Sequence, residues 1–468
     1  MNASPGNRPP ASSRRGLLDR LLSLFADVRG GEGAPALLMM LNVFLLLSCY
    51  YIIKPVREAF ILSGSGAEVK SYASAAMVVV LVFLIPAYSA FASRVNRTTL
   101  LTWVTGFFVV NLIAFYFLAQ ARMPYLDIVF FVWVGIFNVM IIAQFWSLAN
   151  DVYTPDEGKR LFAIIAFGST IGAIVGATLV ENLVDPEKAD PNAVNRMLLV
   201  AAGVLAVCGA LTLLISRRSK VAVSEEAKTS AAEQPLASKG AFRLVLSERY
   251  LLLIGLLMLI VNFVNTTGEY ILGETLERTA KSLAAAGQTA GLAAEEFEKQ
   301  FIGNYYAGFF KWVNWVTALV QLFIVSRFLK WFGVRAALFV LPLIALGGYA
   351  MLALAPVLSV IRGVKIAENS VDYSLQNTTR QALFLPTSRE AKYKAKQATD
   401  TFFWRAGDVL SAALVFVGSQ LALPPRGFAL VNIVLVLAWI VIVIGLARLH
   451  KQRTADSEAV PATAPARA

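Results

Sequence analysis

Residues 36–62 read ALLMMLNVFLLLSCYYIIKPVREAFIL and carry no charged side chain before Lys54. A run of this length is long enough to cross the roughly 30 Å hydrocarbon core of a bilayer as a helix. A helix is expected because a single span must satisfy its own backbone hydrogen bonds in lipid. The end of the run nevertheless contains three ionisable residues, Lys54, Arg57 and Glu58. Ionisable side chains are unusual within an apolar span, so their presence has to be explained.

Comparable apolar runs recur along the chain, and a window of about 19 residues separates roughly twelve of them. We expect these spans near residues 34–62, 70–92, 99–119, 124–150, 160–183, 196–216, 245–271, 302–326, 335–355, 358–385, 398–421 and 426–449. The alternating hydrophobicity of a membrane β-barrel, in strands of about ten residues, is absent. The expected fold class is therefore all-α: a polytopic membrane protein with about twelve transmembrane helices in two six-helix halves, the major facilitator-like arrangement.

The composition of the 468-residue chain also indicates a membrane protein. Hydrophobic residues make up 57% and charged residues 15%, against about 25% charged residues in soluble domains. The mean hydropathy is +0.64. In a membrane protein, a net charge of +12 indicates loops that are rich in Lys and Arg. The expected partner is therefore a lipid bilayer, and nucleic acid is not expected as a partner. Two cysteines in apolar runs and one histidine supply no disulfide framework and few metal ligands, so neither a metal nor a cofactor is predicted.

Lys and Arg concentrate in alternate loops, for example at Arg94 and Arg97 and at Arg217, Arg218 and Lys220. By the positive-inside rule these loops and both termini are cytoplasmic, which predicts a multi-pass membrane protein with both ends on the same side. The polar stretch that follows residue 217 is expected to link the two halves. The predicted divisions are a cytoplasmic tail (1–33), an N-terminal half (34–216), a linker (217–244), a C-terminal half (245–449) and a second cytoplasmic tail (450–468).

Ionisable side chains inside a span cost at least about 2.5–3.5 kcal/mol on insertion scales, so they are functional candidates. In the first span, Lys54 and Glu58 are four residues apart and are expected to pair on one helix face, which leaves Arg57 free for a ligand. The alternative is an interfacial helix end with basic side chains that snorkel toward the headgroups.

The tenth span carries the densest set of polar side chains. They recur every three to four residues and therefore share one stripe of a helix, which we expect to face a cavity. The stripe consists of Arg362, Lys365, Glu368, Asn369, Asp372, Gln376 and Arg380. The alternative is a helix that begins later, with an ion-paired ladder that locks helices together.

Two further spans add candidates, and a third shows a packing pattern. In the eleventh span Asp408 follows Arg405 by three residues, close enough to pair with it. The seventh span adds Asn265. In the fifth span Gly168, Gly172 and Gly176 form a smooth face that predicts close helix packing rather than a ligand site.

Several motifs resemble those of the bacterial and plastid-type ADP/ATP carriers, the nucleotide transporters of plastids and intracellular bacteria. Residues 54–58 (Lys-Pro-Val-Arg-Glu) and 64–68 (Gly-Ser-Gly-Ala-Glu) are similar to that family's Arg-Asp-Thr-Lys-Asp and Gly-Ser-Ser-Ala-Glu. Residues 145–150 (Phe-Trp-Ser-Leu-Ala-Asn) and 156–159 (Asp-Glu-Gly-Lys) resemble its Phe-Trp-Gly-Phe-Ala-Asn and Asp-Glu-Ala-Lys. The second half of the family is matched in order by residues 373–375, Pro386 and residues 392–396.

The resemblance implies a major-facilitator-like antiporter that exchanges nucleotides, with basic residues on the phosphates. Arg57 stands where the family has its first-helix Lys. The fourth-helix Glu falls on Val134, the seventh-helix Glu on Asn265 and the eleventh-helix Lys on Asp408. Three of the four charged positions therefore differ, and Lys365, Arg380 and Arg405 could supply the phosphate-binding charge from other places.

We predict a secondary active transporter, most simply an ATP/ADP antiporter that works by alternating access. Its predicted substrate-binding residues are Lys54, Arg57, Glu58, Asn265, Lys365, Glu368, Asp372, Arg380, Arg405 and Asp408. The four acidic residues would pair with the basic ones while the site is empty. The alternative is a major-facilitator transporter of another organic anion or of a proton-coupled solute. An enzyme is not predicted, because the sequence contains neither a P-loop nor a nucleophile elbow.

Overall fold

The computed structural model describes residues 28–29, 31–92, 97–153, 155–188, 190–219, 241–388, 391 and 395–459. These residues form a bundle of helices, and none of them lies in a strand. The predicted all-α fold class is therefore confirmed. Linker residues 220–240, most of the N-terminal tail, residues 460–468 and basic loop residues such as Arg94 and Lys392 lie outside the described residues.

A first group of helices is arranged around α2, which contains the run that opens the sequence. The group consists of α2 (Gly33–Gly64), α3 (Gly66–Ala92), α4 (Arg97–Gln120), α5 (Leu126–Val152), α6 (Pro155–Leu183) and α7 (Ala193–Ser219). The most extensive contact of α2 is with α6. A side chain added at Gly168, Gly172 or Gly176 would meet the α2 backbone, so the glycine face predicted from the sequence is a close helix contact.

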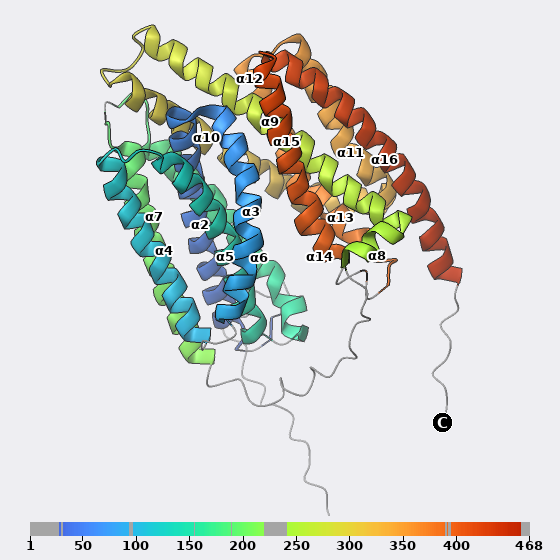
Figure 1. Cartoon of the computed structure of the whole chain (residues 1–468). Helices are drawn as coiled ribbons and strands as arrows, with labels where there is room; N and C mark the ends of the chain where they lie inside the picture. The colour runs from blue at the N-terminus through green and yellow to red at the C-terminus, as the bar shows by residue number, and fades with distance from the viewer. Residues whose placement is uncertain are drawn as a thin grey trace, which may run out of the picture.

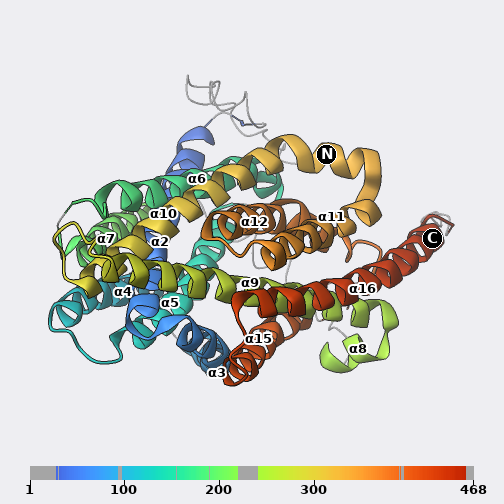
Figure 2. The same ribbon diagram turned by 90° about the horizontal axis from the view of Figure 1, so that it is seen from above.

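The second group contains helices interrupted by π-helical turns. It consists of α8 (Ala241–Ser247), α9 (Arg249–Ala285), α10 (Ala294–Leu319), η2 (Val320–Val325), α11 (Ser326–Leu354), α12 (Leu358–Val371), η3 (Asp372–Gln376), α13 (Asn377–Ala382), α14 (Lys396–Ala398), η5 (Thr399–Phe403), α15 (Trp404–Gln420) and α16 (Pro425–Ala459). Helix α10 also packs against α2 and α6, so it joins the two groups (Figure 2).

Ten helical stretches among the described residues are long and apolar enough to cross a membrane, whereas the sequence predicts about twelve. The difference has two physical causes. The predicted spans 302–326 and 335–355 lie in one continuous 61-residue stretch, which turns at Gly333 with a φ of 73°. The predicted span 358–385 runs continuously through α12, η3 and α13, but its polar stripe makes it too charged and too weakly apolar to count among the ten.

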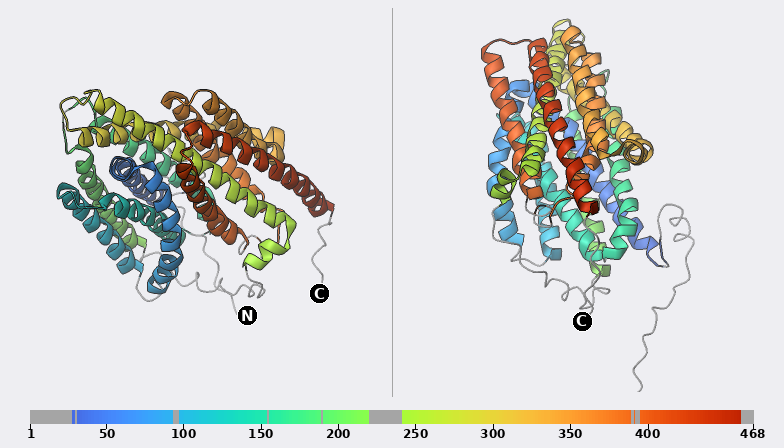
Figure 3. Two further views of the ribbon diagram at one scale, coloured as in Figure 1. Left: turned by 45° about the horizontal axis from the view of Figure 1, so that its top comes forward. Right: turned by 90° about the vertical axis from the view of Figure 1, so that its right-hand side faces the viewer.

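The two groups lie side by side, with α2–α7 on one side and most of α8–α16 on the other (Figures 1 and 3). The start of α2 and the end of α16 lie at the same end of the bundle (Figure 1). Polar contacts between the groups gather at the opposite end. There the Ala67 amide donates to Glu277 Oε2 at 2.9 Å, and Ser419 Oγ donates to Glu68 Oε1 at 2.8 Å. The division of the chain into two six-helix halves remains a prediction.

An ion pair between Glu32, just before α2, and Arg160 of α6 makes stability depend on pH. Both guanidinium NH2 groups of Arg160 donate to the Glu32 carboxylate, at 2.7 and 2.9 Å, and this lowers the pKa of Glu32. Because the folded pKa lies below the unfolded one, the stabilisation is present at neutral pH and is lost as the pH falls through the folded value. We expect Glu32→Gln to unfold at a lower temperature than the unmodified protein at neutral pH. In thermal unfolding at a series of pH values, this difference should shrink on acidification; a constant difference would contradict the assignment.

Candidate functional site

A cavity of about 200 Å³ lies between the two groups of helices. The first group contributes charged side chains from α2 and α3, and the second contributes them from α9 and α15. The charged lining residues are Lys54, Arg57, Glu58, Lys70, Glu269, Arg405 and Asp408. Four cations therefore face three carboxylates, a formal surplus of one positive charge. Such a concentration of charge at membrane depth is costly, so the cavity is the leading candidate for the functional site.

Glu58 is the centre of an ion-pair cluster at the α2–α3 side of the cavity. It is buried, and its Oε2 lies 2.7 Å from Lys70 Nζ. Its Oε1 accepts hydrogen bonds from Arg57, including one of 3.0 Å from Nε. Arg57 also lies over the ring of Phe131, 4.7 Å from its centroid. The sequence-based expectation that Lys54 would pair with Glu58 and leave Arg57 free is therefore wrong, because Lys70 from the neighbouring helix takes one carboxylate oxygen and Arg57 the other.

Lys54 is surrounded by aromatic faces instead of a carboxylate. Its Nζ lies 3.9 Å from the ring centroid of Phe310 and 5.2 Å from that of Tyr51. In the described part of the chain, no carboxylate oxygen comes within ion-pair distance of Lys54. Aromatic rings attract a cation without neutralising it. Lys54 is therefore a lining cation whose charge no carboxylate neutralises by direct contact among the described residues.

On the α15 side of the cavity, Arg405 and Asp408 pair as their spacing predicts. Arg405 Nη1 lies 3.2 Å from Asp408 Oδ2. The other oxygen of Asp408 accepts hydrogen bonds from Asn262 Nδ2 at 2.8 Å and from Thr266 Oγ1 at 3.0 Å, both on α9. Asp408 is thus held by two α9 side chains, whereas the Arg405 side chain remains 31% exposed toward the cavity.

Lys365 lies behind the cavity wall rather than in the wall. Its side chain is fully buried, and its Nζ donates to Asn265 Oδ1 at 2.8 Å and to Glu368 Oε2 at 3.0 Å. It also lies 3.5 Å from Glu269 Oε1. Because Glu269 and Asn265 line the cavity, they connect Lys365 and Glu368 to it.

Asp372 and Arg380 form a separate pair that does not line the cavity. Their closest charged atoms lie 3.5 Å apart, and the Arg380 guanidinium packs over Trp404 at 4.7 Å. From the polar stripe of the tenth predicted span, only Asn369 lines the cavity. The stripe does not face one chamber because α12 lies against both α9 and α11, and because the π-helical turn η3 changes the helical phase at Asp372.

The cavity thus brings together six of the ten predicted residues: Lys54, Arg57, Glu58, Asn265, Arg405 and Asp408. Lys365, Glu368, Asp372 and Arg380 lie outside its lining. Sequence reasoning missed Lys70, which stands at the edge of a predicted span and resembles an interfacial lysine. It also gave little weight to Glu269, because a single carboxylate in the predicted span 245–271 is a weak signal by itself.

The helix arrangement is similar to that of solved membrane transporters. The crystal structure of the nucleoside transporter NupG superposes with a TM-score of 0.59 at 14% identity, covering 89% of this chain and 99% of that chain. A bacterial homologue of the iron transporter ferroportin, in an inward-facing state, gives a TM-score of 0.59 at 13% identity over 88% of this chain and 98% of that chain. At these identities the likeness concerns the fold alone. Together with a charged cavity between two groups of helices, it defines a polytopic, all-α membrane protein whose candidate site lies between the groups.

Sequence comparison assigns the family. Residues 123–450 match the family model of the TLC ATP/ADP transporters, and the chain belongs to this family. ADP,ATP carrier protein 1 of Chlamydia pneumoniae is 24% identical over 70% of this chain and 69% of its own length. The carrier of the same name from Chlamydia trachomatis is 23% identical over 69% of this chain and 64% of its length. ADP,ATP carrier protein 4 of Rickettsia conorii is 21% identical over 94% of this chain and 95% of its own length. The resemblance found in the sequence motifs is confirmed.

Proposed function

We propose that this chain exchanges ATP for ADP across a membrane by alternating access. The observation that carries the proposal is the cavity between the two groups of helices, in which four cations face three carboxylates and Lys54 has no carboxylate partner among the described residues. Family membership supports a nucleotide as the cargo. The aligned parts cover 64–69% of the length of the two chlamydial carriers.

We place the phosphates of the cargo on Lys54, Arg57, Lys70 and Arg405. A guanidinium group can hold two phosphate oxygens at once, whereas the Lys54 ammonium acts as a point charge. Lys54 can bind phosphate without first breaking an ion pair. Glu58 and Asp408 would hold Arg57 and Arg405 in position while the cavity is empty. Phe131 and Tyr373 line the same cavity and offer ring faces on which a base can stack.

The family's charges are kept on the same helices, one turn away from the positions that the motif alignment gives. Asn265 stands at the seventh-helix Glu position, and Glu269 lines the cavity four residues later. Asp408 stands at the eleventh-helix Lys position, and Arg405 lines the cavity three residues earlier. In contrast, Val134, at the fourth-helix Glu position, is fully buried in the apolar core. We infer that the cavity keeps a cation and a carboxylate on these two helices despite the substitutions.

The polar contacts between the two groups gather at the end opposite the helix termini, at Ala67–Glu277 and Glu68–Ser419. We propose that these contacts close the cavity on the outer side and that it opens toward the cytoplasm. Both termini would then be cytoplasmic, and the membrane would be the bacterial inner membrane. In the other state of the cycle, the two halves rock about the cavity and these contacts separate.

Counterflow in proteoliposomes tests the proposed exchange. Vesicles loaded with ADP should take up labelled ATP, and vesicles without internal nucleotide should not. Absence of uptake at saturating nucleotide would reject this cargo. Uptake of another organic anion in the same vesicles would then favour the alternative function, a transporter of a different organic anion. The substitutions at Asn265 and Asp408, relative to the family's charged positions, are consistent with such a change of cargo.

Replacement of Lys54 by Gln should weaken nucleotide binding more than it weakens folding. A hydrogen bond to a charged group is worth about 1.5–3 kcal/mol, so the KM of exchange should rise by roughly 10- to 150-fold. The matched control is Lys188→Gln, which removes an exposed lysine paired with Asp185, outside the cavity. Equal KM values for the two variants, measured by counterflow, would remove Lys54 from the site.

A further inference from the structure

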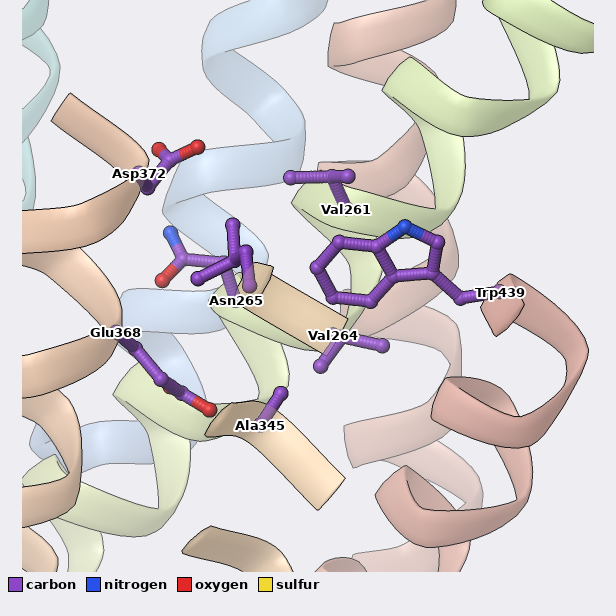
Figure 4. A pocket seen from close by; sticks show the side chains of 8 residues that line it. Val261, Val264, Asn265, Ala345, Glu368, Asp372 and Trp439 are labelled. Carbon is purple, nitrogen blue, oxygen red and sulfur yellow. The ribbon is translucent and has the colours of Figure 1, made fainter. Parts of the chain in front are cut away.

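A second, smaller pocket lies behind the wall of the cavity, among α9, α11, α12 and α16. Its volume is about 20 Å³, which is room for a single water molecule. Most of its lining is apolar, from Val261, Val264, Leu341, Ala345 and Trp439. Figure 4 shows Glu368 reaching from α12 toward Ala345, with the Trp439 ring on the opposite side.

Glu368 presents an unpartnered oxygen in these surroundings. The residue is 5% exposed, and its Oε2 accepts hydrogen bonds from Lys365 Nζ at 3.0 Å and Tyr349 Oη at 3.3 Å. Its Oε1 is buried and has no hydrogen-bond partner. A buried polar oxygen left unpaired costs roughly 1–3 kcal/mol, and more when it is charged. Such a group needs either a bound partner or neutralisation.

The charges around Glu368 do not balance when every group is ionised. Lys365 is shared by Glu368 of its own helix and Glu269 of α9. From α11 the facing group is the neutral Tyr349 hydroxyl, and α16 contributes the Trp439 ring. Asp372 of η3 also lines the pocket, but it has its own partner in Arg380 of α13. Within this cluster two carboxylates therefore share one ammonium, which leaves a surplus negative charge. Glu269 also shares the cavity lining with Lys54, Lys70 and Glu58, whereas Glu368 is buried and has no second cation among the described residues.

We propose that the Glu269–Lys365–Glu368 cluster binds one proton, with the pocket beside Glu368 as its site. A proton removes the surplus charge and converts the unpaired oxygen of Glu368 into a hydroxyl that can donate to a water molecule of the pocket's size. A metal cation fits poorly, because hard cations require about six or more oxygen ligands. The pocket offers few oxygens, and the side-chain oxygen of Asn265 already accepts from Lys365. Because Glu269 and Glu368 interact through Lys365, they titrate as a coupled pair, and the proton is shared between the two carboxylates.

The cluster is positioned to sense the cargo. Glu269 lines the cavity, whereas Glu368 lies behind it, and both contact Lys365. An anion in the cavity raises the cost of a negative charge on Glu269, so anion binding should favour uptake of the proton. By linkage, protonation should raise the affinity for the anion by the same factor. The proton itself comes from water in the cavity through Glu269. This coupling step, unlike proton binding, rests on the proposed function.

The first test requires no cargo. Infrared difference spectra of the purified protein, recorded between alkaline and acidic pH, should show a buried carboxylic acid band that grows on acidification. The band should be lost in Glu368→Gln or Glu269→Gln and kept in Glu274→Gln, which removes a carboxylate of α9 that pairs with the exposed Arg278. If the unmodified protein shows no such band, or if both cluster variants keep it in full, the proposal is overturned even where one variant fails to fold.

The second test measures the coupling. Calorimetric titration with ADP in buffers of different ionisation enthalpy should show net proton uptake, up to one per ADP, in the unmodified protein and in Glu274→Gln. Glu368→Gln should bind ADP with no such uptake. Binding without proton uptake in the unmodified protein would overturn the coupling. Failure of ADP to bind, with the infrared band still titrating, would reject the proposed cargo and leave the proton site supported.

Discussion

Replacing Gly172 of α6 by alanine is expected to destabilise the protein strongly, although only one methyl group is added. A Cβ at this position would lie 2.9 Å from the Phe44 carbonyl carbon and closer still to its oxygen. Both are backbone atoms of α2, so no side chain can turn aside to make room. Ser48 Oγ also donates to the Gly172 carbonyl at 3.1 Å, a bond that depends on this close approach. Overpacking of this kind costs about 1–3 kcal/mol, and occasionally more.

The matched control is Gly203→Ala on α7, where an added Cβ meets nothing within 4 Å. Alanine favours a helix over glycine by about 1 kcal/mol, so this variant should be neutral or slightly more stable. Thermal unfolding in detergent compares the two variants with the unmodified protein. Gly172→Leu should be worse than Gly172→Ala. If Gly172→Ala unfolds at the same temperature as Gly203→Ala, the close α2–α6 contact is not as the structure shows it.

Hydropathy predicted the helical architecture because a single span in lipid has to satisfy its own backbone hydrogen bonds, which requires a helix. The glycine face of α6 could be predicted for a similar reason, since small residues four apart allow two backbones to approach. The span that was hard to delimit is the one in which charged side chains interrupt the apolar pattern, through α12 and η3. There the sequence could not show that α12 turns different side chains toward α9 and α11.

The candidate site was only partly predictable, because ion pairing within one helix competes with partners from other helices. The spacing of Lys54 and Glu58 allows a pair, but nothing in the sequence shows that Lys70 of α3 lies nearer to Glu58. Arg405 and Asp408 pair as predicted because α9 supplies hydrogen-bond donors to Asp408 and no competing cation. Sequence spacing therefore identifies possible pairs, and the packing of neighbouring helices selects among them.

Substitution of Lys365 by methionine is expected to have the largest effect of any single charge removal in the second group of helices. Lys365 is the shared partner of Glu269 and Glu368, and its side chain is fully buried. Its removal leaves Glu368 without a cation in a buried position and takes one cation away from Glu269 at the cavity wall. Loss of one partner of a buried pair typically costs about 3–5 kcal/mol. We expect a large fall in the unfolding temperature and loss of nucleotide exchange.

The control is Lys188→Met, which breaks an exposed pair with Asp185. Exposed pairs contribute about 0–1 kcal/mol, so this change should be small. A triple variant, Lys365→Met with Glu269→Gln and Glu368→Gln, removes the orphaned charges as well, and it should recover much of the stability without recovering exchange. This pattern separates an electrostatic role of Lys365 from simple packing, because methionine fills a similar volume in both variants. If the triple variant is as unstable as Lys365→Met alone, packing at this position rather than uncompensated charge explains the loss.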